Sequence, residues 1–194
     1  MTELLLIIFA AALVNNFVLV QFLGLCPFLG TSKRMDGALG MALATGLVLT
    51  LSSGLSYLIE HYVLLPFGVG YLRLISFILV IGATVQFTEL ALRRVSPLLH
   101  RILGLYLPLI ASNCAVLGVA LLNSTQQRTL LSALFYGAGA ALGFGIVLTL
   151  LSGLRERLED ADVPSPFRGP AIALVTAGIM SLAFFGFTGF ARLS

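Results

Sequence analysis

The two cysteines of the chain, Cys26 and Cys114, are the side chains best suited to chemistry, and they share a local pattern. Each one opens the sequence Cys-x-x-Leu-Gly, with the glycine at position 30 in the first copy and at position 118 in the second. A thiolate is a good metal ligand. Both cysteines lie in or beside long apolar stretches that offer a thiolate few other partners. The pattern predicts a metal site, provided that the fold brings the two cysteines together.

Other roles for the cysteines stay open. A free cysteine often packs as a small buried hydrophobe, and the pair could form one disulfide if the two residues meet. Zinc is normally held by four ligands, and His61 and His100 lie near the expected membrane edges, where they are poorly placed to complete such a site. An iron–sulfur centre also needs four ligands, usually thiolates. Because this chain has two cysteines, such a centre requires two more from a second chain.

The composition says what kind of scaffold must position these residues. Of the 194 residues, 59% are hydrophobic and 10% are charged, and the mean hydropathy is +1.06. Soluble domains carry about 25% charged residues, so the sequence predicts an integral membrane protein. Glu3 is the only charged side chain before the first apolar segment. Since a signal peptide begins with a positive region, we expect this segment to stay in the mature protein.

Six apolar segments are long enough to be membrane spans, which need about 20 residues each. They cover residues 4–24, 37–58, 71–92, 102–122, 130–151 and 170–190. Lys and Arg are unevenly distributed between them. Eight follow the first, third and fifth segments (positions 33, 34, 93, 94, 101, 155, 157 and 168), and three lie on the opposite side (73, 128 and 192). Cytoplasmic links carry the excess, so both termini are expected to face away from the cytoplasm.

The chain also repeats itself. Residues 46–55 and 145–154 are identical at eight of ten positions, and Glu60 then aligns with Glu159. The cysteine pattern recurs in the same order, in the first and fourth segments, which makes chance similarity between Leu-rich helices the weaker explanation. Residues 1–95 and 96–194 each hold three segments. The sequence therefore predicts one membrane domain made of two three-helix repeats with inverted topology.

Both cysteine segments are expected to be broken helices. Pro27 follows Cys26, and proline disfavours helix in the residue before it. Pro108, Ser112 and Asn113 precede Cys114. Broken helices at matching places in two repeats mark binding sites within membranes. We expect Asn16, Ser112 and Asn113 to support the breaks, and the free backbone N–H groups there to donate to sulfur.

Two further features have simpler explanations. Glu89 lies one helical turn before Arg93, so a local ion pair is the favoured role for it, while a proton or sodium pathway is the alternative. The glycines of the fifth segment, at positions 137, 139, 143 and 145, predict close helix packing. No phosphate loop, nucleophile elbow or zinc-hydrolase helix is present, and we expect no independent enzymatic activity from this chain.

Several stretches resemble the NqrDE/RnfAE family of membrane subunits. They are Asn-Asn-Phe-Val-Leu-Val-Gln-Phe-Leu-Gly-Leu-Cys-Pro-Phe (15–28), Gln-Phe-Thr-Glu (86–89), Leu-Pro-Leu-Ile-Ala-Ser-Asn-Cys-Ala-Val-Leu-Gly (107–118), Leu-Arg-Glu-Arg (154–157) and Ala-Asp-Val-Pro (161–164). The resemblance covers nearly the whole chain and does not depart from the family pattern at either cysteine.

The resemblance implies a specific function. Members of this family are subunits of bacterial inner-membrane Rnf complexes, or of the related sodium-pumping NADH:quinone oxidoreductase. The Rnf complex couples electron transfer between NADH and ferredoxin, or a similar low-potential carrier, to ion translocation. The resemblance implies six spans and a [2Fe–2S] cluster held by Cys26, Cys114 and two cysteines of a sister subunit, RnfE. The other implied partners are RnfB, RnfC, RnfD and RnfG, which include the carriers of flavins and soluble clusters.

Two other functions fit the residues alone. A small secondary transporter built on an inverted repeat needs no redox centre and would tolerate replacement of both cysteines. A purely structural anchor for redox subunits would tolerate it too. The sequence leaves open the coupling ion, the direction of electron flow, the acceptor, and any part that Glu89 plays in ion movement.

Overall fold

The computed structural model describes residues 7–14, 16–32, 35–95, 107–126, 129–159 and 169–193, and every regular element in these ranges is helical. After a helical turn at 7–9, the elements are η1 (Ala10–Val14), α2 (Phe17–Val20), α3 (Leu25–Thr31), α4 (Met35–Ile59), η2 (Glu60–Leu64), α5 (Leu65–Phe67), η3 (Gly70–Leu72), α6 (Arg73–Val95), α8 (Leu107–Ala111), α9 (Cys114–Thr125), α10 (Leu130–Glu159) and α11 (Pro170–Leu193). Elements η1 and η2 are π-helices. The predicted all-α class is confirmed for the described residues.

Three helices among the described residues are long and apolar enough to cross a membrane, at Gly37–Phe67, Gly70–Ala91 and Leu130–Leu158. They contain most of the second, third and fifth expected segments. Shorter apolar helices, Leu109–Thr125 and Pro170–Gly186, fall in the fourth and sixth. The first segment is divided into short helices instead of one span. Residues 4–6, 15 and 102–106 of the expected spans lie outside the described residues.

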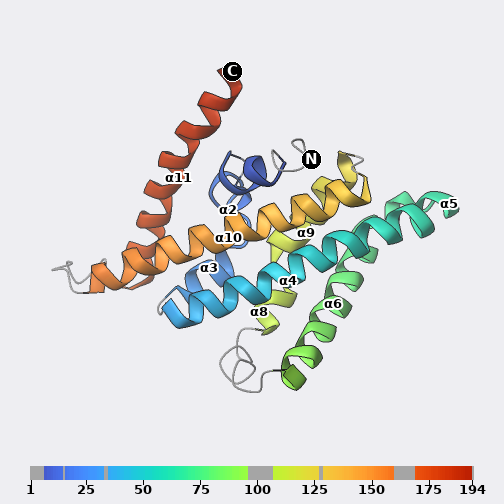
Figure 1. Cartoon of the computed structure of the whole chain (residues 1–194), viewed down its shortest axis with the longest axis horizontal. Coiled ribbons are helices and arrows are strands. Elements are labelled where there is room, and N and C mark those ends of the chain that lie inside the picture. The colour runs from blue at the N-terminus through green and yellow to red at the C-terminus, as the bar shows by residue number, and fades with distance from the viewer. Residues whose placement is uncertain are drawn as a thin grey trace.

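Helices α4 and α10 form the central pair of the fold and run side by side in opposite directions (Figure 1). A Cβ built on Gly46 lies 3.5 Å from Cβ of Ala141, and a Cβ built on Gly145 lies 3.5 Å from Cβ of Ala42. Further along the pair, Gly54 faces Leu134. Small residues at the crossing let the two backbones approach closely, as in many membrane helix pairs.

The contacts of this pair follow the sequence repeat. Ala42 and Gly46 stand 99 positions before Ala141 and Gly145. The contact of Gly46 with Ala141 therefore corresponds to that of Gly145 with Ala42, with the two helices exchanged. Internal bonds correspond as well. The hydroxyl of Thr50 donates to the carbonyl of Gly46 at 2.9 Å, and that of Thr149 donates to the carbonyl of Gly145 at 2.7 Å.

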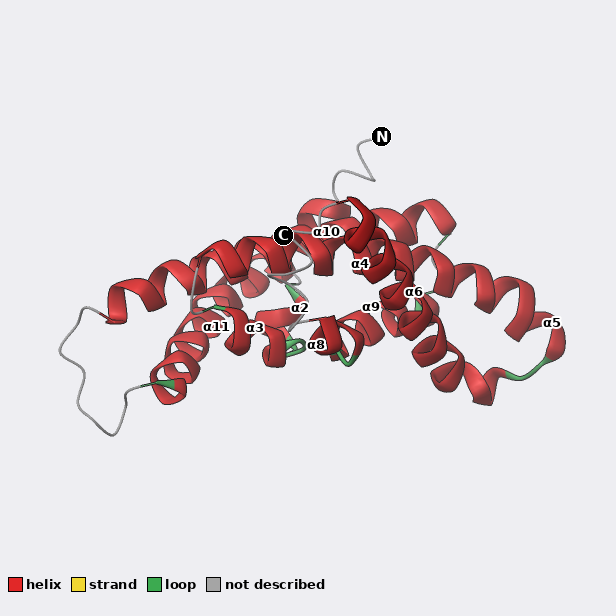
Figure 2. Ribbon diagram, turned by 90° about the horizontal axis from the view of Figure 1, so that it is seen from below, coloured by secondary structure: helices red, strands yellow, loops and turns green. Residues whose placement is uncertain are grey.

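The remaining helices cover this pair on one side (Figure 2). Helices α6 and α9 contact α4, whereas η1, α2 and α11 contact α10. Gly139 and Gly143 allow the close approach of η1, because a Cβ at Gly143 would lie 2.8 Å from the carbonyl oxygen of Ala12. The rings of Phe17 and Phe144 stack with their centroids 6.5 Å apart. The predicted close packing at these glycines is confirmed.

The outer face of α4 and α10 is strongly apolar. Large side chains that are 40% to 66% exposed recur every fourth residue on both helices, at Leu43, Leu47, Leu51, Leu55, Leu142, Ile146, Leu150 and Leu154. An apolar face of this extent is typical of a surface that meets lipid or another protein. It agrees with the predicted membrane class.

Candidate functional site

The first cysteine lies just after an interruption between α2 and α3. Helix α2 ends at Val20, and the chain turns through Phe22 and Gly24, whose φ angles are 53° and 81°. Gly24 is the N-cap of α3, and Cys26 occupies the first turn of that helix. The break therefore lies at residues 21–24, just before Cys26 instead of on it, which corrects the expectation drawn from Pro27. Pro27 also lies in the first turn of α3, where its missing N–H leaves no intrahelical bond unmade.

Asn16 stabilises a second break, between η1 and α2. Its Oδ1 accepts a hydrogen bond from the N–H of Val18 at 3.1 Å and caps α2. Its Nδ2 donates to the carbonyl of Ala12 at 3.0 Å and to that of Gly143 in α10 at 3.1 Å. Asn16 is buried, so these bonds satisfy an amide that has no access to water. Its neighbour Asn15 lies outside the described residues.

The second cysteine begins helix α9. Helix α8 ends at Ala111, Ser112 and Asn113 form the break, and Cys114 is the first helical residue after it. The Oδ1 of Asn113 accepts a hydrogen bond from the N–H of Ala115 at 3.0 Å, which caps α9. Such a cap stabilises a helix by about 1 kcal/mol. The expected interruption of this segment is therefore present at residues 112–113.

The two interruptions meet in space. The backbone N–H of Gly24 donates a hydrogen bond to Sγ of Cys114 at 3.0 Å. A Cβ at Gly24 would lie 3.0 Å from Cβ of Ala115 and 3.2 Å from Oδ1 of Asn113. Glycine is therefore required at position 24 for two reasons, its positive φ and the close approach of α9. The contact brings the loop before Cys26 against the start of the helix that carries Cys114.

Both thiols are accessible on the surface of the chain. Cys26 and Cys114 are free and exposed, so the structure does not support the alternative of small buried hydrophobes. Ser112, beside them, is exposed as well. Asn113 is buried, and its Nδ2 has no hydrogen-bond partner among the described residues. A buried amide donor without a partner is unusual, and this one lies next to Cys114.

This donor set fits half of a thiolate metal site. It consists of two exposed thiols and one backbone N–H that already donates to sulfur. Within the described part of the chain, no group of three or more His, Cys, Asp or Glu side chains gathers around a possible metal. His61 instead stacks on Tyr57, and His100 lies outside the described residues. Cys26 and Cys114 are thus suited to share a centre with ligands from elsewhere.

The expected ion pair between Glu89 and Arg93 is not formed. Glu89 is only partly buried and Arg93 is exposed, and an exposed pair of this kind contributes little free energy to hold two long side chains together. Within the described residues the ion pair lies elsewhere, between Glu60 and Arg73 at 3.0 Å. This pair was not predicted from the sequence. The available signal was one charge at the end of an apolar segment and the opposite charge at the start of the next.

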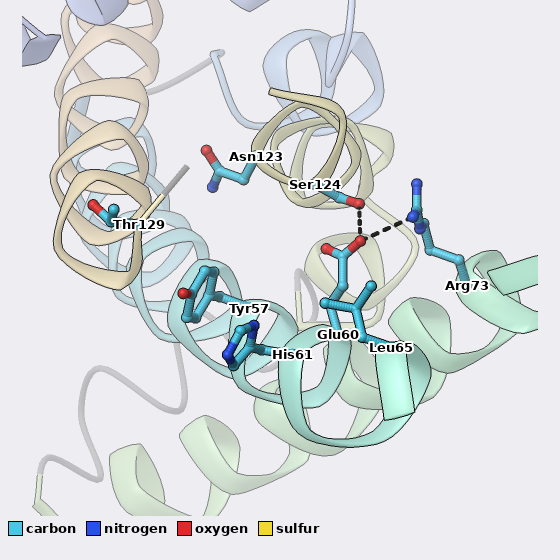
Figure 3. Close-up of a pocket in the computed structure, with 8 residues that line it drawn as sticks. All are labelled: Tyr57, Glu60, His61, Leu65, Arg73, Asn123, Ser124 and Thr129. Atoms are coloured by element: carbon cyan, nitrogen blue, oxygen red, sulfur yellow. Dashed lines mark hydrogen bonds and ion pairs between the residues drawn. The ribbon is translucent and has the colours of Figure 1, made fainter. Parts of the chain in front are cut away.

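Glu60 and Arg73 line a polar cavity of about 350 Å³. Figure 3 shows the other residues around it, which come from α4, η2, α5, α9 and the residue just before α10. They are Tyr57, His61, Leu65, Asn123, Ser124 and Thr129. The hydroxyl of Ser124 donates to Oε1 of Glu60. The cavity joins the end of α4 and η2 to the last turn of α9.

Comparison with known proteins agrees with the resemblance seen in the sequence. Residues 4–191 match the family described as Rnf-Nqr subunit, membrane protein. The chain is 63% identical over 193 residues to the A subunit of the ion-translocating oxidoreductase complex of Alkalilimnicola ehrlichii, covering all of both chains. It is 60% identical over 193 residues to the corresponding protein of Aliivibrio salmonicida, which has the same name, again over the full length of both. The protein of this name from Shewanella oneidensis is 59% identical over 192 residues, 99% of this chain and all of that one. The chain therefore belongs to the Rnf-Nqr family of membrane subunits.

Proposed function

We propose that this chain is the A-type membrane subunit of a complex that couples electron transfer between NADH and ferredoxin, or a similar low-potential carrier, to ion translocation. The names of its relatives, which cover its full length, support the role in an ion-translocating oxidoreductase complex. In this role the chain has no independent activity. It belongs to the bacterial inner membrane, and it works only with the other subunits of the complex.

Within the complex, Cys26 and Cys114 hold one half of a [2Fe–2S] cluster, and two cysteines of a related subunit hold the other half. The observation that carries this proposal is the hydrogen bond from the N–H of Gly24 to Sγ of Cys114, which joins the two cysteine-bearing breaks. Both thiols are exposed on this chain. Exposure on one chain is what a site shared at a subunit interface requires.

When bound, the cluster supplies one-electron transfer. The residues of this chain position and tune the site. Asn113 caps α9 and so fixes the start of the helix that carries Cys114. The N–H of Gly24 withdraws electron density from the thiolate of Cys114. Hydrogen bonds to sulfur stabilise the reduced state and raise the reduction potential.

The partners follow from the incomplete ligand set. RnfE, as the sister subunit, supplies the two missing thiolates. RnfB, RnfC, RnfD and RnfG complete the path of electrons to and from soluble carriers. The exposed apolar rows of α4 and α10 leave a large surface for lipid or for these membrane subunits.

The architecture that we propose for the chain is a six-span inverted repeat, with residues 1–95 and 96–194 as its halves and both termini in the periplasm. The paired contacts of α4 and α10 support it, because Gly46 meets Ala141 where Gly145 meets Ala42. The antiparallel course of these two helices supports it as well. In such a repeat, the matching breaks before Cys26 and Cys114 come together near the middle of the membrane.

The test is the electron paramagnetic resonance signal and the iron content of the purified complex. Cys26→Ser and Cys114→Ser should each remove the signal of the shared cluster and lower the iron content, without loss of the subunit. Thr125→Ala, at an exposed end of α9, is the control and should change neither. An unchanged signal in both serine variants would overturn the cluster proposal. Substrate flux by this chain alone, without partners, would instead favour a secondary transporter.

A further inference from the structure

A charged residue near the end of α10 holds the far end of the helix that carries Cys26. Nη1 of Arg155 donates to the carbonyl of Leu29 at 2.9 Å and to Oγ of Ser32 at 2.6 Å. Leu29 lies in the last turn of α3, and Ser32 is the C-cap of that helix. Carbonyls in the last turn of a helix have no partner within the helix. Arg155 therefore supplies, from α10, a donor that α3 itself lacks.

The next residue of α10 holds the start of α4. Oε1 of Glu156 accepts a hydrogen bond from the N–H of Met35, the first residue of α4, at 3.3 Å. A cation is favourable at the C-terminus of a helix and a carboxylate at the N-terminus. Each charge therefore has the sign that its helix prefers. Two consecutive residues of α10 thus fix both sides of the link between α3 and α4.

Arg155 is specific to the second copy of the sequence repeat. The match between residues 46–55 and 145–154 stops just before it, and Arg155 aligns with Ser56. Arg155 is half-buried and forms no ion pair with any residue that the structure describes. Its charge is instead directed at two neutral oxygens at the end of α3. The arginine is therefore not a part of the shared helix pattern, but a residue that serves α3.

The helix that carries Cys114 is fixed at its far end in a comparable way. Nδ2 of Asn123, near the end of α9, donates to Oγ of Ser53 in α4 at 2.7 Å. Helix α3, from the first proposed repeat, is thus held by α10 of the second, whereas α9 is held by α4 of the first. The starts of α3 and α9 meet through the N–H of Gly24 and Sγ of Cys114. Because α4 packs on α10, these contacts form a closed ring that positions both cysteines.

We propose that Arg155 is a positioning residue, which sets the distance between the thiols of Cys26 and Cys114 by fixing α3 against α10. Helix α3 has only seven residues, and a helix of this length is not stable without outside contacts. A displacement at Ser32 is carried along this short helix to Cys26 in its first turn. A binding site needs its groups held within about 0.5 Å of the required geometry. The inference rests on the proposed function, because the spacing matters to the complex only if the thiols share a centre.

The test is the spacing of the two thiols in the full-length chain, inserted in membranes without the sister subunit. Bifunctional methanethiosulfonates of increasing length are reacted with Cys26 and Cys114, which are the only cysteines of the chain. Mass spectrometry then measures the yield of cross-linked peptide for each length. In the wild type, the yield should peak at one length.

Arg155→Gln shortens the side chain and removes its charge. At the length that is best for the wild type, the yield should fall by up to about tenfold, which is the effect of losing one hydrogen bond to a charged group. The yields at other lengths should rise, because Cys26 then occupies a wider range of positions. A role in stability alone would lower the melting temperature of the chain without changing the preferred length.

Two variants separate positioning from charge. Arg157→Gln removes the same charge two residues along, at an exposed position, and should leave the yields unchanged. Because a single nitrogen of Arg155 makes both bonds, the ammonium group of Arg155→Lys can replace it and should keep most of the wild-type preference. Unchanged yields in Arg155→Gln, an equal change in Arg157→Gln, or no recovery in Arg155→Lys would overturn the proposal.

Ser32→Ala alters the same contact from α3, and it replaces Arg155→Gln if that variant does not accumulate in the membrane. It removes one of the two acceptors, so the length preference should weaken, and a wild-type preference would then count against the proposal. The intact complex gives a separate readout, since Arg155→Gln should broaden the paramagnetic signal of the proposed cluster. Absence of this signal from the wild-type complex would contradict the cluster, but it would not alter the measured spacing of the thiols.

Discussion

The N–H of Gly24 donates to Sγ of Cys114 at 3.0 Å, although 90 residues separate them in the chain. Gly24 ends the break before the first cysteine, and Cys114 begins the helix after the second break. One hydrogen bond thus joins two places that share a sequence pattern. The N–H of an N-cap residue has no partner within its own helix. At Gly24 this free N–H binds the sulfur of Cys114 instead.

The first prediction concerns this contact. Gly24→Ala places a Cβ on a residue with φ of 81°, at 3.0 Å from Cβ of Ala115. We expect a loss of about 1–3 kcal/mol of stability from backbone strain, together with displacement of the Gly24 N–H from Cys114. Thermal unfolding of the purified complex and its paramagnetic signal are the measurements.

The matched control for Gly24 is Gly30, the glycine of the same cysteine pattern. A Cβ at Gly30 would lie 3.6 Å from Cδ2 of Leu109, an ordinary contact, and Gly30 lies within α3. Gly30→Ala should leave both measurements close to wild type. Equal effects of the two substitutions would mean that the loop before Cys26 does not depend on the approach of α9.

The second prediction separates the helix cap that Asn113 provides from the electrostatic effect of this position on the proposed centre. Asn113→Ala removes the cap of α9 and should cost about 1 kcal/mol. Asn113→Asp keeps an oxygen for the N–H of Ala115 and places negative charge at a helix N-terminus, which is favourable, but it removes the Nδ2 donor. The Asp variant should keep the thermal stability, while its added negative charge beside Cys114 lowers the reduction potential of the proposed centre. A potentiometric titration followed by paramagnetic resonance measures the change, and an unaltered potential would mean that the proposed centre does not lie close to Asn113.

The third prediction tests the symmetric packing of α4 and α10. The Cβ separations of 3.5 Å at Gly46–Ala141 and at Ala42–Gly145 suit a disulfide, whose Cβ atoms lie about 3.5–4.5 Å apart. In a background of Cys26→Ser and Cys114→Ser, the double variants Gly46→Cys/Ala141→Cys and Ala42→Cys/Gly145→Cys should both cross-link on oxidation. Band shifts after cleavage of the chain between the two helices report the link, and each single variant is the control. Linkage of only one pair would show that the two contacts are not equivalent.

The fourth prediction compares two glycines of α10 that stand two positions apart. Gly143→Ala should destabilise the subunit by about 1–3 kcal/mol, because its Cβ would lie 2.8 Å from the carbonyl oxygen and 3.0 Å from Cα of Ala12. Gly145→Ala meets only Cβ of Ala42 at 3.5 Å and gains helix propensity. Its melting temperature in detergent should equal or exceed that of the wild type. The reverse order of melting temperatures would contradict the close packing of η1 on α10.

Sequence periodicity and composition predicted the helical membrane class and the importance of the two cysteine segments. Pro27 and Asn113 predicted interrupted helices, because proline and asparagine are strongly preferred at the starts of helices. The glycines of α10 predicted close packing for the same kind of reason. These features depend on a few neighbouring residues, so they can be read from the chain directly.

Features that depend on distant residues were not predictable in the same way. The position of the first break depends on Phe22 and Gly24, which adopt positive φ where α9 approaches. Glu60 pairs with Arg73 and Ser124 across three helices. Glu89 has a partner in sequence at the correct spacing, yet it forms no ion pair with any residue that the structure describes. Spacing along the sequence does not show which ion pair forms. An exposed pair such as Glu89 and Arg93 would add little stability, whereas the Glu60–Arg73 pair is partly buried and Ser124 also binds Glu60.

The exposure of both thiols has a consequence for how the complex is made. A copy of this chain that is inserted in the membrane alone presents Cys26 and Cys114 on its surface, open to oxidation and to adventitious metals. For the cluster proposed above, assembly with the proposed sister subunit should therefore precede, or accompany, delivery of iron and sulfide. Cells gain from synthesising the two subunits in equal amounts, and an excess of this one should be the form that quality-control proteases remove.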